Sequence, residues 1–119
     1  MRLFLITMFF KGTTVISDMS TEFHVYTLDW NADRLIFYVD GYQYQMVKND
    51  GTQAGYPFTR SMNILINLKI GIPGDTWSGI NGIDDSIFPV HHVIDYVRQY
   101  ALPGYNLNSK IFLKSFECK

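Results

Sequence analysis

The 119-residue sequence has few charged residues, one cysteine and no long apolar run. Charged residues make up only 18% of the chain, and the formal net charge is −1 at pH 7. This balance gives no electrostatic basis for binding nucleic acid or a charged membrane surface. The single cysteine, Cys118, has no second cysteine with which to form an internal disulfide. A membrane-spanning helix needs about 20 apolar residues in succession, so we predict no membrane span.

The N-terminal residues MRLFLITMFF are apolar except for one basic residue, Arg2. This beginning is similar to a secretory signal, but the run ends at Lys11 and no small-residue cleavage site follows. Three interpretations stay open for residues 1–16: a degenerate signal, a buried strand, or translation from a wrong start site in a truncated gene. We favour the last two.

Aromatic residues, at 16% of the chain, are concentrated in runs that turn residues separate. In residues 22–41, EFHVYTLDWNADRLIFYVDG, the runs 23–30 and 34–40 are joined by Asn31-Ala32-Asp33. A third run, 42–47, follows Asp40-Gly41, and Asp50-Gly51 marks the next turn. Runs of this kind with turn residues between them indicate antiparallel strands.

Residues 62–70 show the clearest alternation in the chain. Every even position is apolar, and the odd positions include Asn63, Asn67 and Lys69, which predicts a strand with one core face and one polar face. Residues 92–100 predict another strand, and residues 108–119 either add a short strand or fray. No helical periodicity stands out, so we predict an all-β fold, an antiparallel β-sandwich.

Several motifs, in order, resemble those of the family-16 glycoside hydrolases, the laminarinase and lichenase group. The motifs are SDMSTEFHVYTLDW, FYVDG, MNILINLKIG and FPVHHVIDYVRQY. The resemblance covers about residues 17–100 and divides the chain into an N-terminal segment, 1–16, a family-like region, 17–101, and a tail, 102–119. It implies part of a concanavalin A-like jelly roll with a sugar cleft on its concave face.

The catalytic signature of that family, E-x-D-x-x-E, does not occur in this sequence, whose only glutamates are Glu22 and Glu117. Retaining glycosidases need two carboxyl groups about 5–5.5 Å apart, one as nucleophile and one as acid/base. The resemblance therefore implies the C-terminal portion of such an enzyme, with no catalytic residue of its own. We expect it not to hydrolyse glycosides alone, although it descends from enzymes that cleave O-glycosyl bonds.

The resemblance also implies sugar-contact residues. Asn67 matches a cleft asparagine and Trp77 a cleft-loop tryptophan, while Lys69 stands where lichenases have tryptophan. Asn63 shares the predicted polar face with Asn67 and Lys69. His24 matches the histidine of the F-H pair, and a histidine hydrogen-bonded within the sheet is at least an equal alternative to a sugar contact.

One further residue, Asp95, matches an aspartate that this family uses to bind a structural calcium ion, the one cofactor that the resemblance suggests. A surface aspartate is the alternative. The expected partner is a β-glucan, preferably β-1,3-linked. A non-catalytic β-glucan-binding protein is the alternative function to the glycosidase portion. A remnant without a ligand is the third hypothesis. The resemblance implies an extracellular protein, although no clear signal peptide is present. Self-association through exposed sheet edges is also expected.

Overall fold

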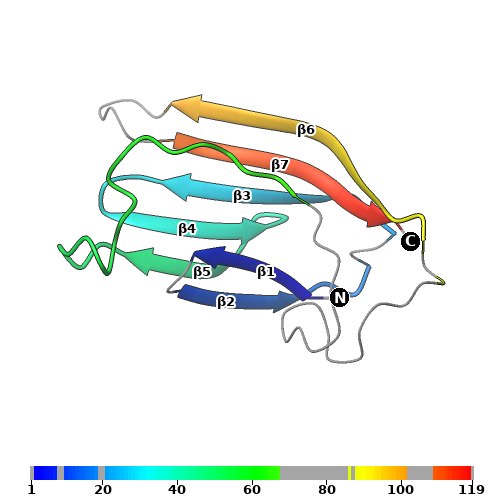
Figure 1. Cartoon of the computed structure of the whole chain (residues 1–119), viewed down its shortest axis with the longest axis horizontal. Helices are drawn as coiled ribbons and strands as arrows, with labels where there is room; N and C mark the ends of the chain where they lie inside the picture. Colours follow the sequence, from blue (N-terminus) through cyan, green and yellow to red (C-terminus); the bar gives the residue numbers. More distant parts are fainter. Residues whose placement is uncertain are drawn as a thin grey trace.

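The computed structural model describes residues 2–7, 10–18, 21–67, 86, 88–101 and 109–118, and this part of the chain consists of strands joined by turns and loops. The strands are β1 (Arg2–Thr7), β2 (Phe10–Val15), β3 (His24–Trp30), β4 (Arg34–Val39), β5 (Tyr42–Lys48), β6 (His91–Ala101) and β7 (Ser109–Cys118). A five-stranded sheet has the order β5-β4-β3-β7-β6, and β1 and β2 form a separate two-stranded sheet beside β5 (Figure 1). Every pairing is antiparallel, which confirms the predicted all-β fold.

The turn between β3 and β4 is fixed by a single side chain. The Oδ1 atom of Asn31 accepts hydrogen bonds from the backbone N–H groups of Asp33 and Arg34, both at 2.9 Å. Asparagine favours such turns because its short amide can replace a backbone acceptor. The turn predicted at Asn31-Ala32-Asp33 is therefore confirmed.

The turn between β4 and β5 is a two-residue hairpin loop made of Asp40 and Gly41. Both have positive φ angles, 49° and 83°, and Val39 pairs with Tyr42 directly across the loop. Positive φ at both central positions matches the right-handed twist of the strands, and Asp-Gly is a preferred sequence for this geometry. The loop aims the Asp40 carboxylate back toward the start of β3, where its Oδ1 accepts a hydrogen bond from Val25 N–H at 2.8 Å.

The core lies on one face of strands β3 to β5, beneath a loop that folds back over it. Its buried members come from those strands and from this loop: Trp30, Leu35, Phe37, Val47, Tyr56 and Phe58. Leu35, Phe37 and Val39 are buried as their alternation predicts. Ile36 on the opposite parity is also only 6% exposed, so both faces of β4 are covered.

Both ends of the described chain are in strands. The apolar N-terminal residues include strand β1, which pairs with β2, so the strand that one interpretation of this segment predicted is present. β7 lies inside the sheet between β3 and β6, so the tail adds a strand rather than fraying, and this strand is ten residues long rather than short (Figure 1).

The strand predicted at residues 62–70 is wrong in its described part, residues 62–67, which are not in a strand. This segment lines a groove together with residues of β3 and β4. Met62 and Ile64, expected in the core, are 48% and 47% exposed, and Leu65 is 85% exposed. Alternation describes the faces that a strand would have, but a strand forms only where a neighbouring backbone pairs with it. Residues 68–70 lie outside the described residues.

Candidate functional site

An apolar groove of about 300 Å³ lies over the sheet face that carries the core. Strands β3 and β4 supply one wall through Leu28, Trp30 and Phe37, and β5 adds Tyr44. The alternation of the strands places these residues on one face, since Leu28 pairs with Phe37 and Trp30 with Leu35. Tyr44 packs against Phe37 with 6.2 Å between ring centroids, and burial raises the pKa of its hydroxyl to about 12. The wall is therefore aromatic and uncharged around neutral pH.

Two hydrogen bonds hold the end of this groove in place. The indole Nε1–H of Trp30 donates to the carbonyl oxygen of Phe58 at 2.8 Å, within the core. The hydroxyl of Tyr56 donates to the carbonyl oxygen of Asn31 at 2.6 Å. Burial, with a smaller contribution from the charge of Asp33, raises the pKa of Tyr56 to about 12, which keeps this donor protonated. Tyr56 also meets Phe58 edge to face at 5.2 Å, so the loop is fixed to the sheet by packing and by both bonds.

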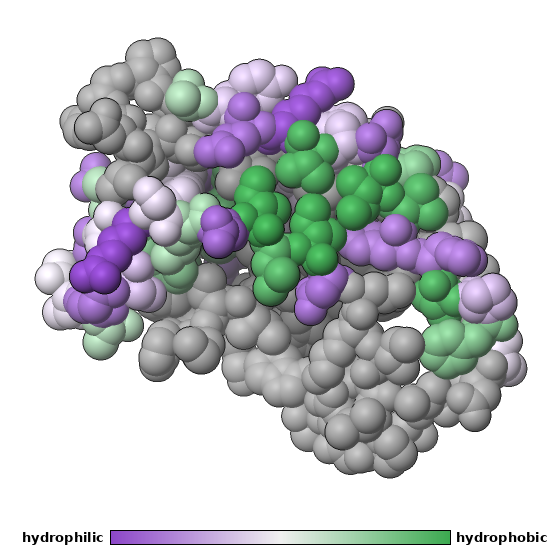
Figure 2. Space-filling model, turned by 45° about the horizontal axis from the view of Figure 1, so that its top comes forward, coloured by the Kyte–Doolittle hydropathy of each residue, from purple (hydrophilic) through white to green (hydrophobic). Residues whose placement is uncertain are grey.

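The other wall of the groove is residues 62–66, and Val97 of β6 also lines it. Its apolar residues are exposed, and Figure 2 shows apolar side chains gathered in one patch on a face of the molecule. The exposed amide of Asn63 lies among them. An apolar, aromatic wall beside an amide can pack against the carbon face of a sugar ring while the amide bonds to its hydroxyls.

The sugar-contact residues predicted from the sequence do not all come together in this groove. Asn63 lines it, whereas Asn67 is exposed and does not. His24 lies in a separate polar network. Lys69 and Trp77 lie outside the described residues.

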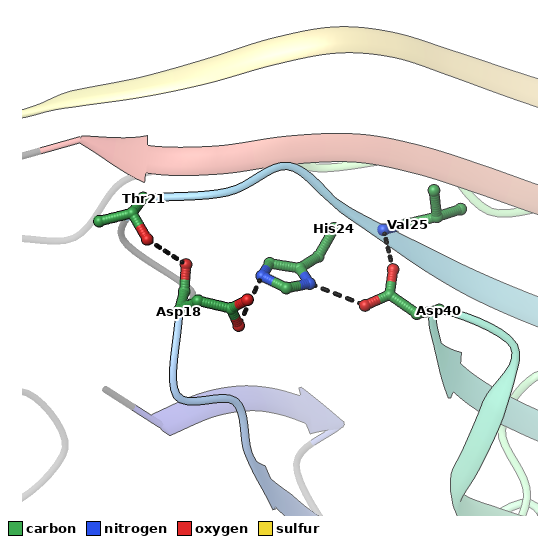
Figure 3. A network of polar contacts seen from close by, with 5 residues as sticks. All are labelled: Asp18, Thr21, His24, Val25 and Asp40. Carbon is green, nitrogen blue, oxygen red and sulfur yellow. Dashed lines mark hydrogen bonds and ion pairs between the residues drawn. The ribbon is translucent and has the colours of Figure 1, made fainter.

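That network surrounds His24, which is only 6% exposed (Figure 3). Its Nδ1 is 2.7 Å from Oδ2 of Asp40, and its Nε2 is 3.3 Å from Oδ1 of Asp18. The contact to Asp18 has the distance of an ion pair but not the geometry of a hydrogen bond, which leaves Nε2 without a hydrogen-bond partner. His24 therefore has the hydrogen-bonded position within the fold that the sequence left open as the alternative to a sugar contact.

The charges around His24 decide its protonation. Burial by itself lowers the pKa, because it disfavours the imidazolium. The hydrogen bond and the charge of Asp40, together with the charge of Asp18, outweigh burial and raise the pKa above the usual 6.5. The sequence contained both partners in its D-x-S-x-x-F-H and V-D-G motifs, but nothing in it indicated that they meet at one histidine.

The predicted calcium ligand, Asp95, lies on the edge strand β6. The register with β7 shifts between Ile94 and Tyr96, so Asp95 is the extra residue of a β-bulge, and it is exposed. Within the described ranges, no group of three or more His, Cys, Asp or Glu side chains is arranged to hold a metal ion.

Two of the described carboxylates belong to the His24 network. Asp18 and Asp40 are the two that lie close to a common group, and His24 stands between them. Both oxygens of Asp40 accept hydrogen bonds, from His24 and from Val25 N–H. These two contacts tie the Asp40 turn to the start of β3. No helix in the described part is long and apolar enough to cross a membrane.

Comparison with known proteins identifies the class to which this fold and groove belong. The sequence model of "Glycosyl hydrolases family 16" matches residues 8–98. The chain is 28% identical to a beta-glucanase of Rhodothermus marinus over 95 residues, which cover 75% of this chain and 32% of that protein. It is 34% identical to the clotting factor G alpha subunit of Tachypleus tridentatus over 80 residues, 66% of this chain and 11% of that protein. A beta-glucanase of Acetivibrio thermocellus is 33% identical over 84 residues, 70% of this chain and 22% of that protein.

The chain therefore belongs to glycoside hydrolase family 16. It spans about a third or less of the length of these relatives. No solved structure matches the fold. The family match confirms the resemblance drawn from the F-H-x-Y, Y-V-D-G and I-D-Y-V-R motifs, and it begins at residue 8, within the segment that the sequence set apart as 1–16.

Proposed function

We propose that this chain carries part of the glucan-contacting surface of a family-16 glycoside hydrolase, acting on β-1,3-glucan, and that the 119 residues alone do not cleave the polymer. The observation that carries the proposal is an aromatic-walled groove with Asn63 on its wall, in a family member without the E-x-D-x-x-E signature. Retaining hydrolysis needs a nucleophile and an acid/base, and removing both abolishes the covalent route.

Reducing-sugar release from laminarin tests the catalytic half of the proposal. The purified chain is incubated with laminarin beside a family-16 beta-glucanase as positive control. We expect no release above the blank. Release that the chain itself produces, and that heat denaturation of the chain abolishes, would contradict the proposal, because another carboxylate pair would then have to act.

A second candidate is a β-glucan-binding protein that needs no catalysis. It is favoured because this chain contains both the groove and the hydrogen bonds that hold it, from Trp30 to Phe58 and from Tyr56 to Asn31. Binding to insoluble β-1,3-glucan by the wild type separates this candidate from a remnant without a ligand.

Matched variants locate the binding. Asn63→Ala removes the amide from the groove wall, and Trp77→Ala removes the ring that the family resemblance assigns to the cleft. Gln53→Ala removes an exposed amide of the Asp50–Tyr56 loop that does not line the groove. We expect the first two variants to be retained less than the wild type and the third to be retained equally. Equal retention of all three would remove the groove from the proposal.

A further inference from the structure

The network of Asp18, His24 and Asp40 joins three segments that are far apart in the sequence. Asp18 lies in the turn after β2, His24 begins β3, and Asp40 lies between β4 and β5. Figure 3 shows the imidazole ring between the two carboxylates. Asp40 belongs to the five-stranded sheet, whereas Asp18 lies on the segment that leaves the hairpin of β1 and β2. The contact between His24 and Asp18 therefore attaches the Asp18 side chain to the sheet. The Asp18 carbonyl also accepts hydrogen bonds from the N–H groups of Thr21 and Glu22 and from the Thr21 hydroxyl, which close the turn before β3.

The hairpin and the sheet are not closely packed beside this contact. A cavity of about 430 Å³ lies between residues 15–18, which follow the hairpin, and residues 42–44 of β5. Val15, the last residue of β2, is 78% exposed. A two-stranded hairpin is marginally stable by itself. The polar contact at Asp18 is therefore important for holding this region.

The chemistry of imidazole makes the contact depend on protonation. Neutral imidazole has one N–H, and the short distance of 2.7 Å to Asp40 assigns it to Nδ1. Nε2 then carries a lone pair that faces the Asp18 carboxylate at 3.3 Å, and two acceptors repel. When His24 is protonated, both nitrogens carry a proton and both contacts attract. Nε2 is buried and has no hydrogen-bond partner among the described residues.

We propose that His24 is a pH-dependent latch: its imidazolium holds the Asp18 turn and the attached hairpin against the sheet, and its neutral form releases them. Other titratable side chains lie on the strands and the turn beside His24, and Ser115, which pairs with His24, is not one of them. Tyr42 and Tyr44 line the cavity, β7 places Ser115 opposite His24, β6 pairs His92 with Glu117, and Glu22 precedes β3. Burial raises the pKa of the Tyr44 hydroxyl to about 12, so this group keeps its proton between pH 5.5 and 8.5.

The sign of the effect follows from the raised pKa of His24. The stabilisation is fully present below pH 6.5, the unfolded value, and is lost as the pH rises through the folded pKa. The latch is therefore closed in mildly acidic solution and open in alkaline solution.

Hydrogen exchange followed by mass spectrometry tests the latch between pH 5.5 and 8.5, with rates corrected for the intrinsic pH dependence. We expect peptides from residues 2–22 to lose protection roughly tenfold for each unit by which the folded pKa of His24 exceeds the unfolded value. Peptides from β4 should keep theirs. An NMR titration of the His24 ring on the same sample gives the folded pKa. Constant protection of residues 2–22 while His24 titrates would overturn the proposal.

Two variants separate His24 from other titrating groups. In Asp18→Asn, the amide N–H₂ can donate to neutral Nε2, so the contact survives deprotonation and the pH dependence should disappear. Glu22→Gln removes a neighbouring carboxylate that contacts His24 in no observed way, so its pH profile should match the wild type. An Asp18→Asn profile identical to the wild type would contradict the latch. If that variant does not fold, the comparison of wild-type exchange with the His24 titration decides the question.

Discussion

Replacing Trp30 with phenylalanine tests whether the groove is held by the bond from its indole to Phe58. Trp30 is 8% exposed, and its Nε1–H is the donor to the Phe58 carbonyl at 2.8 Å. Phenylalanine keeps the apolar character but removes the donor, which leaves a buried carbonyl unpaired at a cost of about 1–3 kcal/mol. The smaller ring also leaves a void and loses buried apolar area, so we expect a total loss of about 2–4 kcal/mol.

This loss is a large part of the stability that a chain of this length can have. A stability of about 0.05–0.15 kcal/mol per residue corresponds to roughly 6–18 kcal/mol for the whole chain. The assay is urea unfolding followed by far-UV circular dichroism, since the substitution removes one of the two tryptophans and would confound fluorescence. Tyr42→Phe is the matched control because Tyr42 is 81% exposed and lies outside the core.

A loss below about 0.5 kcal/mol, the range of ordinary surface substitutions, would refute the reasoning. It would mean that the Phe58 carbonyl finds another donor or that the loop is held by packing alone. Tyr56→Phe distinguishes these cases, because it removes the bond to Asn31 and leaves the ring contact with Phe58 in place.

Three further predictions concern other parts of the described chain. Gly55→Ala should lower the urea midpoint, because a Cβ atom at Gly55 would collide with the Asp50 carboxylate, which accepts hydrogen bonds from Thr52. A midpoint equal to that of the wild type would contradict this collision. Leu65 is 85% exposed, so Leu65→Ser should leave the urea midpoint unchanged. If the chain self-associates through its apolar face, the variant should show a lower mass in sedimentation than the wild type. An unchanged mass in a self-associating wild type would exclude that face as the surface of self-association. His24→Gln should destabilise the chain more at pH 5.5 than at pH 8.5, because the stabilising form of His24 is the protonated one. Urea unfolding at both pH values measures this difference. An equal loss of unfolding free energy at the two pH values would contradict the assignment of the charge to His24.

The hairpins were predictable because their turns depend on local chemistry. Asn31 caps its own turn, and Asp40-Gly41 adopts positive φ angles that its sequence favours, so the ends of β3, β4 and β5 follow from neighbouring residues. Residues 35, 37 and 39 are apolar at every second position and are all buried, and alternation of this kind along one strand needs no knowledge of distant residues.

The segment 62–67 and the tail show where this reasoning ends. Both have strand-like sequences, yet only the tail finds neighbours, because β7 enters between β3 and β6. Pairing between distant segments is a property of topology, and alternation within a segment does not report it. The exposed residues 62, 64 and 65 therefore became one wall of a groove.

The candidate site was predictable in part for the same reason. Asn63 was identified from its polar face and lies in the groove, while the aromatic wall needs β3, β4 and β5 to be brought together. His24 was recognised from its motif, but its two partners, Asp18 and Asp40, come from turns whose meeting point depends on the whole sheet.

The most direct test of the proposed function is prolonged incubation of the pure chain with laminarin, with reducing ends counted against time. The beta-glucanase of Rhodothermus marinus, a relative that matches 75% of this chain, serves as the positive control. We predict a flat trace from the chain and a rising trace from the control, because this sequence has no E-x-D-x-x-E strand. A rise that increases in proportion to the amount of chain would contradict the proposal and show that these residues hold a catalytic pair of their own.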